Sequence, residues 1–192
     1  MNTPGLEARP GSVDEALEEC RLAIANEVFI YDAETTNTNE FYKKPTQYVC
    51  GFLFNTTGDY VVLIKRRESR VYRPGCWNGV GGHVEPGETP LQAMQREFKE
   101  EAGLEISDWK KFATLATDCG ESLIHLFYSE QSTDMIYRVT TETDELVRPI
   151  ALKSLPSLPR IPNLAFLISM AQSIRHCEVD MYHITEEGRR GF

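Results

Sequence analysis

Four carboxylates lie within the ten-residue stretch REFKEEAGLE, residues 96–105. Three of them, Glu97, Glu100 and Glu101, are spaced so that a helix would place them on one face, where like charges repel. One interpretation is a solvated acidic face, the usual role of a charge run. The other is a site for a hard cation such as Mg²⁺, which prefers oxygen ligands and would relieve the repulsion.

The segment around these glutamates has the signals of a helix over residues 89–102. Its ends carry residues suited to the N-cap, the first helical position and the C-terminal stop: Thr89, Pro90 and Gly103. Its apolar residues share one arc of a helical wheel, which predicts the buried face: Leu91, Met94, Phe98 and Ala102. The three glutamates fall on the adjacent arc, next to the glycine-rich loop WNGVGGHVEPGE of residues 77–88. Because Gly81 and Gly82 carry no side chain, that loop can approach the carboxylates closely.

Gly82, five residues, Glu88, seven residues and then REFKEEAGL, residues 96–104, resemble a complete Nudix box. The motif covers 23 residues, and the order of predicted strands around it extends the resemblance to roughly residues 47–174. The resemblance implies an α/β fold, a Nudix-type α/β/α sandwich with a mixed sheet. It also implies hydrolysis of a nucleoside diphosphate linked to another group, with Mg²⁺ or Mn²⁺ as cofactor.

The resemblance also implies roles for individual residues. Glu100 and Glu101 would be metal ligands, and the carbonyl of Gly81 a further ligand. Glu97 would be either a ligand or the base that activates water. These roles agree with metal-assisted hydrolysis, in which the ion polarises a phosphoryl oxygen and lowers the pKa of bound water.

Further charged residues would support this site. Arg96 would orient the glutamates through salt bridges, including one to Glu88. Nudix enzymes often bring another acid from a loop before a late strand, and TTETDELV, residues 140–147, offers Glu145, with Asp144 and Glu142 as rivals. An acidic loop without a catalytic role remains an equal alternative for each of the three.

The stretch KRRESRVYR, residues 65–73, concentrates five bases in an acidic chain. Lys65, Arg67 or Arg73 would contact substrate phosphates, or the segment would be a polar hairpin edge. The sequence does not choose between these interpretations, nor among the three residues.

Two asparagines are candidates for reading the base. The stretch from Trp77 through Asn78 to Gly82 is similar to MutT-type enzymes that act on oxidised purine nucleotides, in which this asparagine reads the base. An amide has both a donor and acceptors, which suits the edge of a purine. Trp77 is expected to pack in the core. Asn163 begins the last predicted helix, where it would read the base or cap the helix.

The remaining elements are predicted from periodicity. Strands are expected over residues 47–55, 60–67, 111–117, 122–129, 135–141 and 146–152, and a second helix over 163–174. Residues 1–46 are expected to form an acidic N-terminal extension with one amphipathic helix, which starts at the Ser12–Glu15 capping box. The Nudix domain would then span residues 47–174, followed by a C-terminal tail, residues 175–192.

Composition limits the partners. The net charge of −9 argues against a broad nucleic-acid-binding face, although a nucleotide substrate can use a metal or a local basic patch. Five scattered cysteines without a CxxC pattern favour a reducing compartment. The absence of a long apolar run and of a signal pattern predicts a cytoplasmic protein that does not enter a membrane. The sequence does not decide whether the protein forms a homodimer.

The resemblance therefore implies a Mg²⁺-dependent nucleoside triphosphate pyrophosphohydrolase that forms a monophosphate and pyrophosphate, with oxidised purine nucleotides such as 8-oxo-dGTP as the expected substrates. One alternative keeps the chemistry and changes the substrate to ADP-ribose, a dinucleoside polyphosphate or a capped RNA end. An alternative of another class is a non-catalytic nucleotide-binding module. Degenerate boxes are typical of that class, whereas this box is intact.

Overall fold

The computed structural model describes residues 45–69, 73–117, 122–176 and 182–185. All of them belong to the compact unit Lys43–Phe192. The N-terminal helix predicted from Ser12 and almost all of the acidic extension lie outside the described residues.

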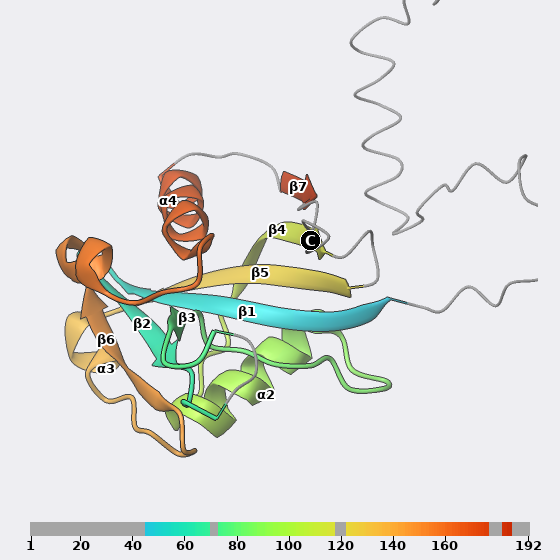
Figure 1. Cartoon of the computed structure of the whole chain (residues 1–192), viewed down its shortest axis with the longest axis horizontal. Coiled ribbons are helices and arrows are strands. Elements are labelled where there is room, and N and C mark those ends of the chain that lie inside the picture. Colours follow the sequence, from blue (N-terminus) through green and yellow to red (C-terminus); the bar gives the residue numbers. More distant parts are fainter. Residues whose placement is uncertain (1–44, 70–72, 118–121, 177–181, 186–192) are drawn as a thin grey trace, which may run out of the picture. The chain divides into compact units, whose positions relative to one another are not determined.

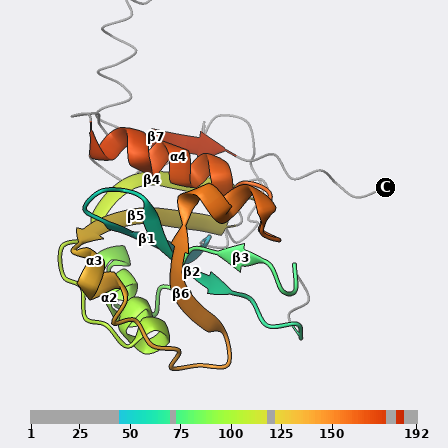
Figure 2. The same ribbon diagram turned by 90° about the vertical axis from the view of Figure 1, so that its left-hand side faces the viewer.

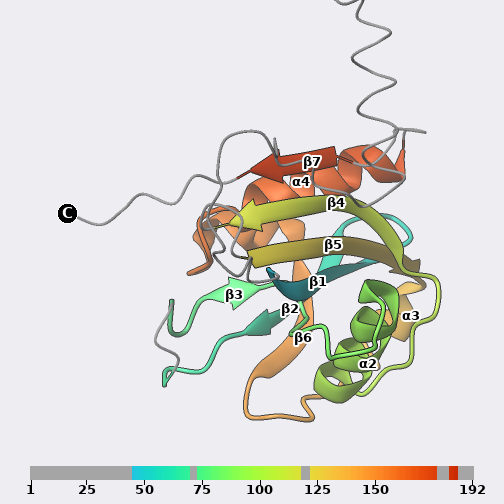
Figure 3. The same cartoon turned by 90° about the vertical axis from the view of Figure 1, so that its right-hand side faces the viewer.

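Among the described residues, seven strands form one mixed sheet in the order β3-β2-β1-β5-β4-β7, with β6 also paired to β2. Their bounds are β1 Thr46–Asn55, β2 Tyr60–Lys65, β3 Trp77–Asn78, β4 Lys110–Thr117, β5 Ser122–Gln131, β6 Leu146–Ala151 and β7 Tyr182–Thr185. The central strands β1 and β5 run parallel over their whole length (Figure 3). Antiparallel pairing joins β2 to β1, β3 and β6, and β4 to β5.

Helices cover both faces of the sheet, α2 (Pro90–Ala102) on one and α4 (Leu164–Arg175) on the other (Figure 1). This burial explains why β1 reads as a continuous apolar run. Leu53 packs in the cluster on the α2 side, whereas its neighbours Phe52 and Phe54 pack in the cluster that contains α4. The expected α/β/α sandwich with a mixed sheet is therefore confirmed. No helix in the part of the chain that the structure describes is long and apolar enough to cross a membrane.

Helix α2 forms as its local signals predict. The Thr89 hydroxyl accepts a hydrogen bond from the Gln92 amide at 3.3 Å, and the Gln92 side chain accepts one from the Thr89 amide at 2.8 Å. At the other end, Gly103 adopts a left-handed φ of 65°, which favours glycine. The predicted buried face is wrong in one position, because Leu91 is 40% exposed and Ala93 is buried instead.

The strand predicted over residues 135–141 is wrong. Its first residues belong to the short helix α3 (Thr133–Ile136), whose N-terminus the Ser132 hydroxyl caps by accepting from the Met135 amide. The following residues form a loop that leads to β6 and bonds to the end of α2, since the Thr140 amide donates to the Ala102 carbonyl at 2.9 Å. Figure 2 shows this loop beside α2. Strand β7 was not predicted, and a 3-10 helix, Leu152–Ser157, joins β6 to the approach of α4.

Candidate active site

The glycine-rich loop after β3 lies alongside the first half of β1. Val80 and Gly51 exchange two backbone hydrogen bonds, of 2.7 and 3.2 Å. Two residues further on, the Gly82 carbonyl accepts from the Val49 amide at 2.9 Å. The loop therefore continues the sheet and is held in place by its backbone.

Two glycines allow the carboxylates of α2 to meet this loop. The Gly81 amide points away from β1 and donates to Oε2 of Glu101 at 3.2 Å. A Cβ at Gly81 would lie 2.1 Å from the Val49 carbonyl oxygen, and one at Gly82 would lie 2.5 Å from Cδ of Glu97. The role of the Gly81 carbonyl as a metal ligand stays a prediction.

Arg96 gathers the carboxylates around one guanidinium. It binds both oxygens of Glu88, at 2.9 and 3.0 Å, and its Nη1 donates to Glu97 at 2.8 Å and to Glu100 at 3.1 Å. Its Nη2 also donates to the His83 carbonyl at 2.9 Å. The salt bridges expected from Arg96, including the one to Glu88, are thus present. The catalytic role of this group stays a prediction.

The charges of this group stabilise one another. Hydrogen bonding to Arg96 is the main cause that lowers the pKa of Glu88, against the opposing effect of burial. The hydrogen bond with Glu88 is likewise the main cause that raises the pKa of Arg96. Burial, and then the charge of Glu101, raise the pKa of the Cys50 thiol to about 12. Glu88 therefore stays charged at neutral pH, and the thiol stays protonated.

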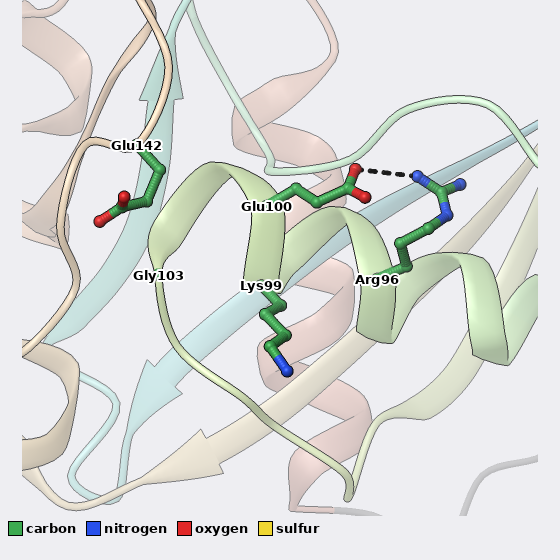
Figure 4. A pocket seen from close by; sticks show the side chains of 5 residues that line it. All are labelled: Arg96, Lys99, Glu100, Gly103 and Glu142. Carbon is green, nitrogen blue, oxygen red and sulfur yellow. Dashed lines mark hydrogen bonds and ion pairs between the residues drawn. The ribbon is translucent and has the colours of Figure 1, made fainter.

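A shallow pocket of about 590 Å³ opens over the C-terminal half of α2 (Figure 4). Its lining residues are Arg96, Lys99, Glu100, Gly103 and Glu142. Glu100 turns toward Arg96, while Glu142 lies across the end of the helix on the loop before β6. Within the described ranges, no three His, Cys, Asp or Glu side chains converge as a metal cluster. The carboxylates instead turn to Arg96 and to the Gly81 amide.

The three rival acids of the loop before β6 have different surroundings. Glu142 lines the pocket. Asp144 is exposed and forms an ion pair with Arg67. Glu145 is buried, with 6% of its surface exposed, and one of its oxygens accepts from the Arg67 amide at 3.1 Å.

The three basic candidates also differ. Lys65 is the last residue of β2, and its Nζ lies 3.8 Å from Oε1 of Glu68. Arg67 forms an ion pair with Asp144, and its backbone amide donates to Glu145, both in the loop before β6. Arg73 is exposed and has a positive φ of 50° in the turn before β3.

The two asparagines lie on neighbouring segments. The Trp77 amide donates to the Pro159 carbonyl at 2.9 Å, and its carbonyl accepts from the Ile161 amide at 3.1 Å. The approach to α4 therefore runs beside β3, which carries Asn78, and leads directly to Asn163. Trp77 is 2% exposed, so its predicted place in the core is confirmed.

The amides themselves differ in their bonding. The Asn78 side chain accepts from the Gly79 amide at 2.8 Å. Asn163 occupies the N-cap position of α4 but makes no side-chain cap hydrogen bond. The capping interpretation of the Asn163 side chain is therefore wrong, and reading of the base stays a prediction.

Sequence reasoning missed the aromatic and cationic neighbours of the glycine loop. The rings of Tyr48 and His83 lie 4.5 Å apart, across a bridge between β1 and the loop. The guanidinium of Arg148, on β6, lies 5.1 Å from the centroid of the Trp77 ring. Both contacts depend on strand pairing between distant segments, so no local pattern signals them.

Comparison with known proteins gives a consistent result. The family model described as NUDIX domain matches residues 44–162. A human protein named 8-oxo-dGDP phosphatase is 31% identical over 69% of this chain, and a Stutzerimonas stutzeri protein named NAD-capped RNA hydrolase is 30% identical over 60%. Each match spans 41% of the relative's own length, so the chain spans less than half of either protein.

Solved structures agree on the fold. A MutT structure from a study of the Aliivibrio salmonicida and Vibrio cholerae proteins superposes with a TM-score of 0.56 at 22% identity. The match covers 68% of this chain and 99% of the MutT chain.

Proposed function

Because this chain belongs to the Nudix family, we propose that it is a divalent-metal-dependent hydrolase that cleaves nucleoside triphosphates to a monophosphate and pyrophosphate. The substrate class is oxidised purine nucleotides such as 8-oxo-dGTP. The observation that supports this proposal most strongly is the group of carboxylates that Arg96 holds beside the glycine loop. The name of the human relative supports the substrate class.

The donor set suits Mg²⁺ or Mn²⁺. Glu97, Glu100, Glu101 and the carbonyl of Gly81 are hard oxygen donors, and they would hold the ion. The bare backbone at Gly82 leaves room for the Glu97 carboxylate, since a side chain there would overlap it. When bound, the ion neutralises phosphate charge and lowers the pKa of the attacking water.

The residues of the chain position the reactants. Arg96 stays charged and fixes the carboxylates in one geometry, which reduces the cost of ordering them during the reaction. Glu97 accepts the proton of the attacking water, or it binds the ion and leaves that proton to Glu145. The water oxygen forms a bond to phosphorus, and the bond between phosphorus and the leaving pyrophosphate oxygen breaks. Glu145 supplies a further negative charge from the loop before β6.

The residues that we propose to bind the base lie on β3 and at the start of α4. Asn78 and Asn163 read the base, because β3 and the approach to α4 run side by side and carry both amides. Lys65 and Arg73 remain the candidates for contacts with phosphate oxygens.

A second substrate class deserves a test, because a relative is named NAD-capped RNA hydrolase. The same residues would then cleave the diphosphate of a capped RNA end, and pyrophosphate would not be released. The pocket over α2 is lined by Glu100 and Glu142 as well as by Arg96 and Lys99, so it presents mixed charges and not a row of bases (Figure 4), which favours the smaller nucleotide.

A panel of substrates with Mg²⁺ tests the proposal. The panel contains 8-oxo-dGTP, dGTP, 8-oxo-dGDP, ADP-ribose and an NAD-capped oligonucleotide, with products separated by chromatography. We expect the highest kcat/KM for 8-oxo-dGTP, with release of pyrophosphate. A higher kcat/KM for the capped oligonucleotide would favour the second substrate class. If none of the compounds were hydrolysed, the proposal would be overturned.

A further inference from the structure

Arg67 lies two residues beyond β2, and acids from a distant part of the chain surround it. Its guanidinium forms an ion pair with Asp144, and its Nε lies 3.7 Å from an oxygen of Glu145. Its backbone amide donates to the same Glu145 oxygen at 3.1 Å. One residue thus holds Glu145 through both main chain and side chain.

Strand pairing brings these residues together. The antiparallel ladder of β2 and β6 runs from Tyr60 opposite Ala151 to Lys65 opposite Leu146. The chain that leaves β2 and the chain that enters β6 therefore continue side by side. Arg67 lies two residues beyond the last backbone pair and Glu145 one residue before it, so Arg67 contacts Glu145 diagonally just past the end of the ladder.

Glu145 lies in the loop before β6, immediately before the first strand residue, Leu146. This loop is tied to the end of α2, because the Glu142 amide donates to the Glu101 carbonyl at 3.4 Å and the Thr140 amide to the Ala102 carbonyl at 2.9 Å. The contacts of Arg67 with Glu145 therefore join the chain that leaves β2 to a loop that α2 also holds.

Burial distinguishes Glu145 from its neighbours. The Glu145 side chain is 8% exposed, whereas Asp144 is 62% exposed and Arg67 is 42% exposed. Removing the partner of a buried carboxylate strongly destabilises the folded protein, whereas an exposed ion pair contributes little to its stability. The contacts of Arg67 to Glu145 therefore contribute to holding this carboxylate in place.

We propose that Arg67 is a positioning residue, which fixes Glu145 in the loop beside the end of α2, and is not a ligand of substrate phosphate. The proposal rests on the function proposed above, in which Glu145 acts in hydrolysis. Two carboxylates already engage the guanidinium, and together the three groups carry a net negative charge. A phosphate would have to displace one carboxylate and approach the other against repulsion.

Steady-state kinetics of Arg67→Met, Arg67→Lys, Glu145→Gln and the Arg67→Met/Glu145→Gln double variant test this. Arg67→Met should lower kcat on the order of tenfold with KM nearly unchanged, and Arg67→Lys should restore part of kcat. The double variant should be no slower than Glu145→Gln alone, since both changes remove one function. Arg138→Met, an exposed arginine in the connection between α3 and β6, is the matched control.

Asp144→Asn separates the two roles of Arg67 further. Loss of the acidic partner should lower kcat a few-fold if Arg67 positions Glu145, whereas it should tighten substrate binding if Arg67 binds phosphate. A rise in KM for Arg67→Met that persists in the Glu145→Gln background would overturn the proposal. So would normal kcat in Arg67→Met, whether or not its Tm falls.

Unfolding by denaturant gives a readout that does not need activity. The unfolding free energies of the wild type, the two single variants and the double variant form a cycle. Non-additive losses would show that Arg67 holds Glu145 even if the wild type hydrolysed no nucleotide, in which case the proposed function alone would fail. Additive losses would refute the positioning role.

Discussion

Replacement of Arg96 by methionine should destabilise the metal-free protein, because it leaves several carboxylates without a counter-charge. The Arg96 side chain is 29% exposed, and its partners Glu88 and Glu97 are 15% and 14% exposed. Removing one member of a buried pair costs about 3–5 kcal/mol and of an exposed pair about 0–1 kcal/mol. The partial exposure places the expected loss at about 2 kcal/mol, which corresponds to a fall in Tm of roughly 4–8 °C for a domain of this size.

Thermal unfolding in EDTA measures this loss. Lys99→Met is the control, since Lys99 is on the same helix but pairs with Glu105 through side chains that are 63% and 78% exposed. Its Tm should change little. Added Mg²⁺ should stabilise Arg96→Met at least as strongly as the wild type, because the ion takes over the neutralisation of the glutamates. Equal Tm values for Arg96→Met and Lys99→Met in EDTA would refute this account of the guanidinium.

Three further predictions concern pH, metal and the N-terminal segment. Because Arg96 lowers the pKa of Glu88 in the folded state, the stability that this pair contributes should be complete above the ordinary pKa of 4.5 and disappear as the pH falls below it. The difference in unfolding free energy between the wild type and Arg96→Met should then shrink in acid, and a constant difference would contradict the linkage. Excess EDTA should abolish hydrolysis and Mg²⁺ or Mn²⁺ should restore it, whereas full turnover in EDTA would exclude the metal site. A protein that starts at Lys43, where the compact unit begins, should keep the kcat of the full chain, and a folded but inactive truncation would show that residues 1–42 take part.

Local signals predicted the acidic helix well. The capping residue Thr89, the terminal Gly103 and the buried Met94 and Phe98 all act within a few residues of their partners. The same locality explains the error at Leu91, because a helical wheel groups side chains by angle and does not show which of them the rest of the fold covers. The strand predicted over 135–141 failed because Ser132 caps a short helix there and Thr140 bonds to α2, and both alternatives compete with strand pairing.

The contacts between site residues that are distant along the chain could not be predicted from the sequence. Arg67 is joined to Glu145 across 78 positions, and only the pairing of β2 with β6 reveals it. The approach of Asn78 to the segment before Asn163 likewise depends on the bonds of Trp77 to Pro159 and Ile161. Residue types and spacing predicted which side chains do the chemistry, whereas long-range register decides which of them meet.

The most direct test of the central claim compares hydrolysis by Glu100→Gln and Glu105→Gln with that of the wild type, in Mg²⁺ and with 8-oxo-dGTP. The two substitutions are identical and nearly isosteric, and Glu105 pairs with Lys99 rather than with Arg96. Glu100→Gln should lower kcat on the order of 10²-fold while the fold is retained, because it removes an anionic ligand from the proposed metal site. Glu105→Gln should turn over like the wild type. Equal turnover by all three proteins would mean that the acidic face of α2 is only a solvated surface.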